Sequence, residues 1–134
     1  MNPAQFFAAL KKSLPQLRKD CKIVLKVEAE NFVLQNFQST KFQSSNPQKW
    51  PRRQREPTPQ RALLVKSGDM KRAATTAKIN PKGIIFNIPL PYASYHNEGT
   101  DRIPQRKWIG ESDMLDIRVK RRTFLQIQKH LNSL

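Results

Sequence analysis

Apolar residues recur at helical spacing along the first 37 residues of the chain. The first group follows Pro3, a residue type favoured in the first turn of a helix, and it predicts a short helix over 3–13. Its apolar members are Phe6, Phe7, Leu10 and Leu14. Pro15 disfavours helical geometry at the residue before it and can itself open a new helix. The pattern therefore predicts a break near Pro15 and a second helix beyond it.

The second predicted helix, over 16–37, is the longest of the chain. Its apolar positions recur at steps that place them on one side of a helix. They are Leu17, Cys21, Val24, Leu25, Ala29, Phe32, Val33 and Phe37. Cys21 lies within this stripe, which favours a small buried side chain over a reactive thiol. Because the chain has one cysteine, an internal disulfide and a cysteine-cluster zinc site are excluded.

The apolar pattern stops between residues 38 and 60. Four prolines fall in this window, and Phe42 and Trp50 are its only large apolar residues. A segment of this composition cannot build a packed core of its own. We expect an extended, flexible arm or loop over 38–60, within a single domain that spans 1–134. Trp50 either anchors this loop, to its own domain or to a neighbouring subunit, or stacks on nucleic-acid bases, and we favour the anchor.

Ordered elements return after residue 60 and include the clearest hairpin signal of the chain. The pattern predicts a helix over 61–66 and a helical turn over 67–73 with a break at Gly68. It then predicts strands over 75–79 and 84–88, joined by the turn 80–83. A helix over 92–99 follows, and a last helix begins at about Ser112, with Ser112 or Asp113 as its cap. The last helix has Leu115, Ile117, Phe124, Ile127, Leu131 and Leu134 at helical spacing. The fold class predicted is α+β: a long N-terminal helix, a small antiparallel sheet built on the hairpin, a C-terminal helix and an extended Pro/Arg-rich loop.

Composition adds a strong positive charge to this picture. The 134 residues carry a net charge of +15 and are 37% hydrophobic, which suits one modest core. Residues 41–72 alone hold nine basic and two acidic side chains. A positive field concentrated in one segment favours contact with nucleic acid or with an acidic protein surface. The candidate contacts are Lys49, Arg52, Arg53 and Arg55. The longest apolar runs are far too short to span a bilayer, so no membrane partner is expected.

The residues that could carry catalysis do not form a recognisable site. Neither His96 nor His130 has a metal-type partner at short spacing, and Ser94, Glu98 and Asp101 are near His96 only in sequence. The chain also lacks a nucleophile-elbow pattern, a phosphate-cradling glycine loop and a carboxylate cluster for a divalent ion. We expect no enzymatic activity, no metal, no cofactor and no small-molecule substrate.

Three segments in the second half of the chain resemble one protein family in their order and spacing. They are Leu64–Ala73 with its Ser-Gly-Asp-Met, Tyr92–Gly99 with Tyr-Ala-Ser-Tyr-His-Asn-Glu-Gly, and Ile103–Ser112 with Ile-Pro-Gln-Arg-Lys-Trp-Ile-Gly. This part of the chain resembles the phage virion morphogenesis family, the Mu-like tail completion proteins. Departures are Lys107-Trp108-Ile109 where Pro-Phe-Leu is common, and Glu98 where the family has an aromatic residue that bears on a subunit contact.

The resemblance implies a non-enzymatic structural protein, in the virion and in the bacterial host cytoplasm during assembly, that finishes the tail or joins it to the head as a ring of subunits. Its partners would be further copies of the chain and tail-tube or head–neck proteins. Residue types that dominate interfaces occur at Trp50, Tyr92, Tyr95, His96, Arg102, Arg106 and Trp108. For Tyr92 and Trp108, ordinary packing is an equal alternative, and His96 is expected to order its own turn by hydrogen bonding. The alternative function is a basic nucleic-acid-binding module that grips phosphates through residues 49–55.

Overall fold

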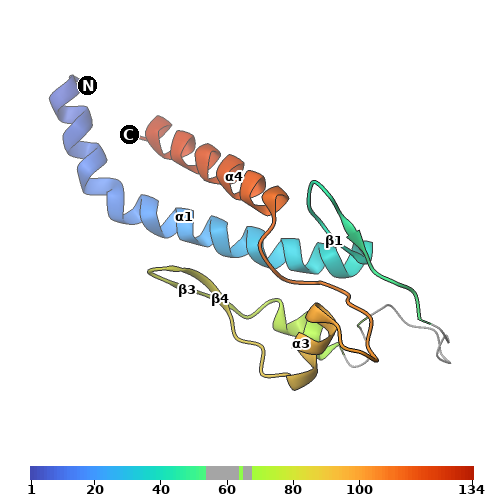
Figure 1. The fold of residues 1–134 in the computed structure, drawn as a ribbon. Helices are drawn as coiled ribbons and strands as arrows, with labels where there is room; N and C mark the ends of the chain where they lie inside the picture. Colours follow the sequence, from blue (N-terminus) through green and yellow to red (C-terminus); the bar gives the residue numbers. More distant parts are fainter. Residues whose placement is uncertain (54–63, 65–67) are drawn as a thin grey trace.

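The computed structural model describes residues 1–53, 64 and 68–134, and it has an α+β architecture (Figure 1). The elements are α1 (Pro3–Ser39), β1 (Lys41–Phe42), β2 (Gln48–Lys49), α2 (Asp69–Ala73), β3 (Ala77–Asn80), β4 (Gly83–Phe86), α3 (Pro91–Glu98) and α4 (Asp113–Asn132). The predicted fold class is confirmed. The helix predicted over 61–66 lies outside the described residues, apart from Leu64, which has a positive φ of 61°.

The N-terminal region is one continuous helix, which corrects the prediction of two. Asn2 caps α1: its Oδ1 accepts a hydrogen bond from the Gln5 amide at 2.8 Å, and the Gln5 side chain accepts one from the Asn2 amide at 3.0 Å. Pro15 lies inside the helix. Proline lacks a donor N–H and crowds the preceding turn, so it bends a helix that flanking residues continue. Figure 1 shows the N-terminal part of α1 turned away from the rest.

Helix α4 runs back along α1 in the opposite direction, so that the C-terminus of the chain approaches the N-terminal part of α1 (Figure 1). On the other side of α1 lie the β3–β4 hairpin and the short helix α3. The hairpin is antiparallel, with Ala77 opposite Phe86 and Asn80 opposite Gly83. None of the helices in the described part of the chain combines the length and the apolar content that crossing a membrane requires.

Part of the predicted arm is structured. Strands β1 and β2 pair antiparallel, and the Trp50 amide extends this pairing by donating to the Thr40 carbonyl at 2.8 Å. Phe42 and Trp50 are both buried and meet the rings of Phe32 and Phe37 edge-on, each at 5.7 Å between centroids. The apolar content of 38–60 therefore serves the core of the whole chain. Residues 54–60 of the arm lie outside the described residues.

The core lies at the C-terminal end of α1, where the other elements converge on it. Its buried members are Phe32, Val33, Phe37, Phe42, Trp50, Met70, Ala74, Ala93 and Trp108. The N-terminal half of α1 contributes none of them, and α4 has no buried residue at all. A chain of this size with one small core has much of its helical surface exposed.

Candidate functional site

The segment 105–109, in the loop between α3 and α4, is fastened to the rest of the chain through Trp108. The indole of Trp108 is 1% exposed and donates to the Ala93 carbonyl at 3.3 Å. Asn97 Oδ1 accepts from the amides of both Trp108 and Ile109, at 2.9 and 3.1 Å. The Trp108 carbonyl accepts from the side chain of Asn36, at 3.1 Å. Trp108 is therefore a packing residue within its own chain.

Neighbouring residues of the same segment bind Trp50 and Pro51 of the arm. The Trp50 indole donates to the Lys107 carbonyl at 2.7 Å, and Arg106 Nε donates to the Pro51 carbonyl at 2.9 Å. Lys107 Nζ lies 4.4 Å from the centre of the Phe42 ring, a cation–π contact. Trp50 thus anchors the loop to its own domain. The other anchor that the sequence allowed for Trp50 was a neighbouring subunit.

Helix α3 and the segment after it meet at Gly99, which has a φ of 80°. A side chain at this position would lie 3.1 Å from the backbone of Gln105. The Arg106 amide donates to the His96 carbonyl at 2.8 Å across the same contact. The Tyr92–Gly99 and Ile103–Ser112 segments, which the sequence singles out as separate motifs, therefore form one structural unit.

The ring of His96 does not order this turn by hydrogen bonding, contrary to expectation. Its Nδ1 is buried and has no hydrogen-bond partner among the described residues, while the ring packs against Tyr92 at 6.3 Å between centroids. Burial, together with the positive charge of Arg106, lowers the pKa of His96 from its ordinary value of 6.5. The backbone carbonyl of His96 and the side chain of Asn97 hold the turn instead.

Two of the four predicted basic residues and two of the predicted interface residues line one surface. Arg52 and Arg53, which follow β2, lie with Arg102 and Arg106 along an open groove of about 590 Å³. We call it the arginine groove; its lining is Pro51, Arg52, Arg53, Thr100, Asp101, Arg102, Ile103, Pro104 and Arg106. Lys49 is exposed on β2 opposite Lys41, and it does not line the groove. Arg55 lies outside the described residues.

A second surface lies on α4, where four apolar side chains on one side of the helix are exposed. Ile117, Phe124, Ile127 and Leu131 are spaced by seven, three and four residues, which puts them on one side of the helix. We call these four the outer stripe. All four are exposed, and Phe124 is 63% exposed. A helix with such a stripe ordinarily buries it against another element.

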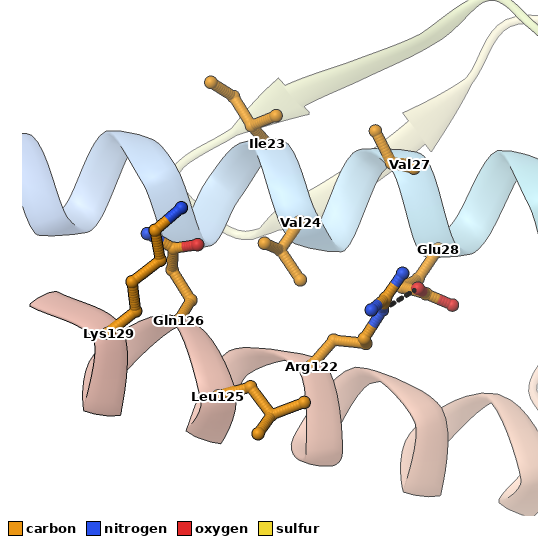
Figure 2. Close-up of a pocket in the computed structure, with 8 residues that line it drawn as sticks. All are labelled: Ile23, Val24, Val27, Glu28, Arg122, Leu125, Gln126 and Lys129. Carbon is orange, nitrogen blue, oxygen red and sulfur yellow. Dashed lines mark hydrogen bonds and ion pairs between the residues drawn. The ribbon is translucent and has the colours of Figure 1, made fainter.

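Polar side chains of α4 are directed toward α1. Arg122 Nε donates to Glu28 Oε1 at 2.9 Å, and Figure 2 shows Gln126 and Lys129 also directed from α4 toward α1. Further along the pair, Arg118 donates to Gln43 Oε1 at 3.0 Å, and His130 Nε2 lies 2.7 Å from Ser13 Oγ. The α1–α4 contact thus includes several polar side chains, while the four residues of the outer stripe stay exposed.

The start of α4 is tied to the β1–β2 connection. Ser112 occupies the N-cap position, but its hydroxyl donates to the Gln43 carbonyl at 2.6 Å rather than capping the helix. Asp113 Oδ1 accepts from the amides of Ser45 and Met114, both at 2.9 Å. The hydrogen bonds from Ser45 hold the pKa of Asp113 below its usual value.

Side chains that could bind a metal ion do not gather in the described part of the chain. There, no three His, Cys, Asp or Glu side chains come together in a way that could hold a metal ion. Comparison with models of known protein families, with curated proteins and with solved structures finds no match to this chain. The resemblance to the phage family therefore stays a prediction.

Two residues important for this geometry have no sequence signal. Asn36 is fully buried and uses both ends of its amide, because its Oδ1 also accepts from the Gln43 amide at 3.1 Å. Asn97 has an equivalent role at the end of α3. Both are short polar residues within helices, and only the three-dimensional approach of a loop gives their side chains partners.

Proposed function

We propose that this chain is a structural protein of phage or prophage virion morphogenesis that completes the tail and helps to join it to the head, acting through ring-type self-assembly. The observation that carries the proposal is the outer stripe of α4. Four large apolar side chains on one face of a 20-residue helix remain exposed in the single chain. Contiguous exposed apolar surface of this kind marks protein–protein contact.

A ring needs two different surfaces on each copy. Besides the outer stripe, α1 exposes Ile23 and Val27, which line a depression beside α4 together with Leu125 (Figure 2). When an apolar surface of one copy packs on a different apolar surface of the next, the contact is heterologous, and it closes into a ring if the rotation allows. The second copy is therefore the occupant that we assign to the outer stripe, with this α1 surface as its counterpart.

The placement of the family-like segments also supports a structural role. Hydrogen bonds that involve the side chains of Asn97 and Trp108, and others between backbone groups, hold together the segments Tyr92–Gly99 and Ile103–Gly110. The two segments thereby support the surrounding loops. In this proposal the protein works in the virion, after assembly in the bacterial host cytoplasm, and its further partners are tail-tube or head–neck proteins.

The test is complementation of a phage from which the gene has been deleted. We expect the deletion to give heads and tails that fail to join, counted by electron microscopy. The unaltered gene and the control Phe7→Asp should restore virions, because Phe7 is as exposed as Phe124 but lies outside both surfaces. Phe124→Asp should not restore them. Normal virions from the deletion would contradict the proposal.

A further inference from the structure

Four arginines from two distant parts of the sequence share the arginine groove, and one carboxylate, that of Asp101, lines it with them. Arg52 and Arg53 come from the segment after β2, and Arg102 and Arg106 from the loop between α3 and α4. The groove therefore has a local excess of positive charge in a concave surface, an arrangement that concentrates the field on an anionic ligand.

Arg106 is the most confined of the four. It is 8% exposed, and its Nε is fixed by the Pro51 carbonyl. Among the described residues, no carboxylate forms an ion pair with its guanidinium. A buried charge is costly unless a counter-charge compensates it. Burial and the nearby charge of Arg53 lower the pKa of Arg106, which nevertheless stays protonated at neutral pH.

The groove continues into a second depression that carries an aromatic ring. This depression has a volume of about 380 Å³, and Tyr95 lies in it beside Thr100, Asp101, Arg102 and Ile103, which also line the groove. The Tyr95 side chain is 51% exposed. An exposed aromatic ring next to a cationic groove is the combination with which proteins bind the bases and phosphates of single-stranded nucleic acid.

We propose that the arginine groove binds the phosphodiester backbone of a nucleic acid, with Arg52, Arg102 and Arg106 on phosphates and Tyr95 stacking on an unpaired base. The guanidinium fork matches two phosphate oxygens at once. An acidic protein surface would supply counter-charges for the arginines. It has no regularly spaced bases that could stack on the Tyr95 ring in the adjoining depression. This site differs from the 49–55 segment that the sequence indicates, because Arg102 and Arg106 join it and Lys49 lies outside it. It does not depend on the proposed role in the tail.

The test measures binding of the full chain to fluorescent DNA across a salt series, with single-stranded and duplex oligonucleotides. The key variant is Arg52→Gln/Arg102→Gln, since both side chains are exposed in the groove. We expect it to bind about tenfold more weakly, with a duplex salt slope lower by about 1.8, because two phosphate contacts are lost. Arg18→Gln/Arg121→Gln makes the same charge change at exposed positions on α1 and α4 and should change the affinity by less than about twofold.

Two further variants separate the parts of the site. Arg106→Lys keeps the charge but loses the fork, and it should weaken binding several-fold while circular dichroism shows an unchanged fold. Tyr95→Ala should weaken single-strand binding about tenfold and leave duplex binding nearly unchanged. Three results would overturn the proposal: no DNA binding at about 50 mM salt, equal losses in the groove and control pairs, or poly-glutamate binding as tightly as DNA with the same sensitivity to the groove pair.

Discussion

At the residue scale, a few buried or half-buried polar side chains decide how the loops meet the core. Asn36 and Asn97 each bind backbone groups of the segment around Trp108. The sequence predicts the helices that carry these residues but not their role, because an asparagine has no periodic signal and Trp108, a partner of both, is more than ten residues away from each. The burial of Trp50 and Trp108 was among the alternatives that the sequence left open.

Replacing Asn97 by alanine should destabilise the fold by about 2 kcal/mol, because two backbone donors, those of Trp108 and Ile109, lose their acceptor. The measurement is the free energy of unfolding from urea denaturation. Asn87→Ala, at an exposed position before α3, is the control and should be nearly neutral. Equal stabilities of the two variants would show that the Asn97 amide does not hold the loop.

His96 should make the fold less stable as the pH falls. Its pKa in the folded chain lies below 6.5, so on acidification the unfolded chain takes up a proton that the folded chain does not. The free energy of unfolding therefore falls as the pH drops below about 6.5. Substituting His96→Gln should flatten the stability curve between about pH 7 and pH 5. A variant curve parallel to that of the unaltered chain would contradict this assignment.

At the element scale, periodicity predicted where helices and strands lie better than which way they face. The hairpin at 77–86 and helices α3 and α4 lie close to their predicted positions. The continuity of α1 through Pro15 was missed, because the preference of proline against helix interiors is local and the neighbouring turns outweigh it here. The rotation of α4 about its own axis could not be predicted from the sequence either. An apolar stripe has the same spacing whether it faces the core of its own chain or another copy.

The exposed face of α4 has a direct consequence for stability. Phe124→Ala should change the free energy of unfolding of the dilute single chain by less than about 0.5 kcal/mol, since the ring is exposed. Phe32→Ala, in the buried core, should cost about 3–5 kcal/mol. Urea denaturation at low protein concentration compares the two. A cost at Phe124 as large as that at Phe32 would mean that the stripe packs within its own chain.

At the scale of the whole molecule, the chain has one small core at one end of a long helix pair. Several large apolar residues along that pair are exposed, and four arginines line a groove elsewhere on the chain. The two surfaces suit a protein that works in contact with other molecules. In our proposals, the outer stripe contacts further copies of the chain and the arginine groove contacts an anionic polymer. Charge alone favours nucleic acid as the partner, whereas the exposed face of α4 is the basis on which we propose self-assembly.

The most direct test of this account is the mass of the purified chain in solution, measured by sedimentation equilibrium over a range of concentrations. We predict a fixed multiple of the 15.6 kDa chain mass at high concentration. Phe124→Asp should shift the population to single chains, and Phe7→Asp, at an equally exposed position outside both surfaces, should leave the multiple intact. A mass of 15.6 kDa at every concentration, or equal dissociation by the two variants, would contradict assembly through the outer stripe.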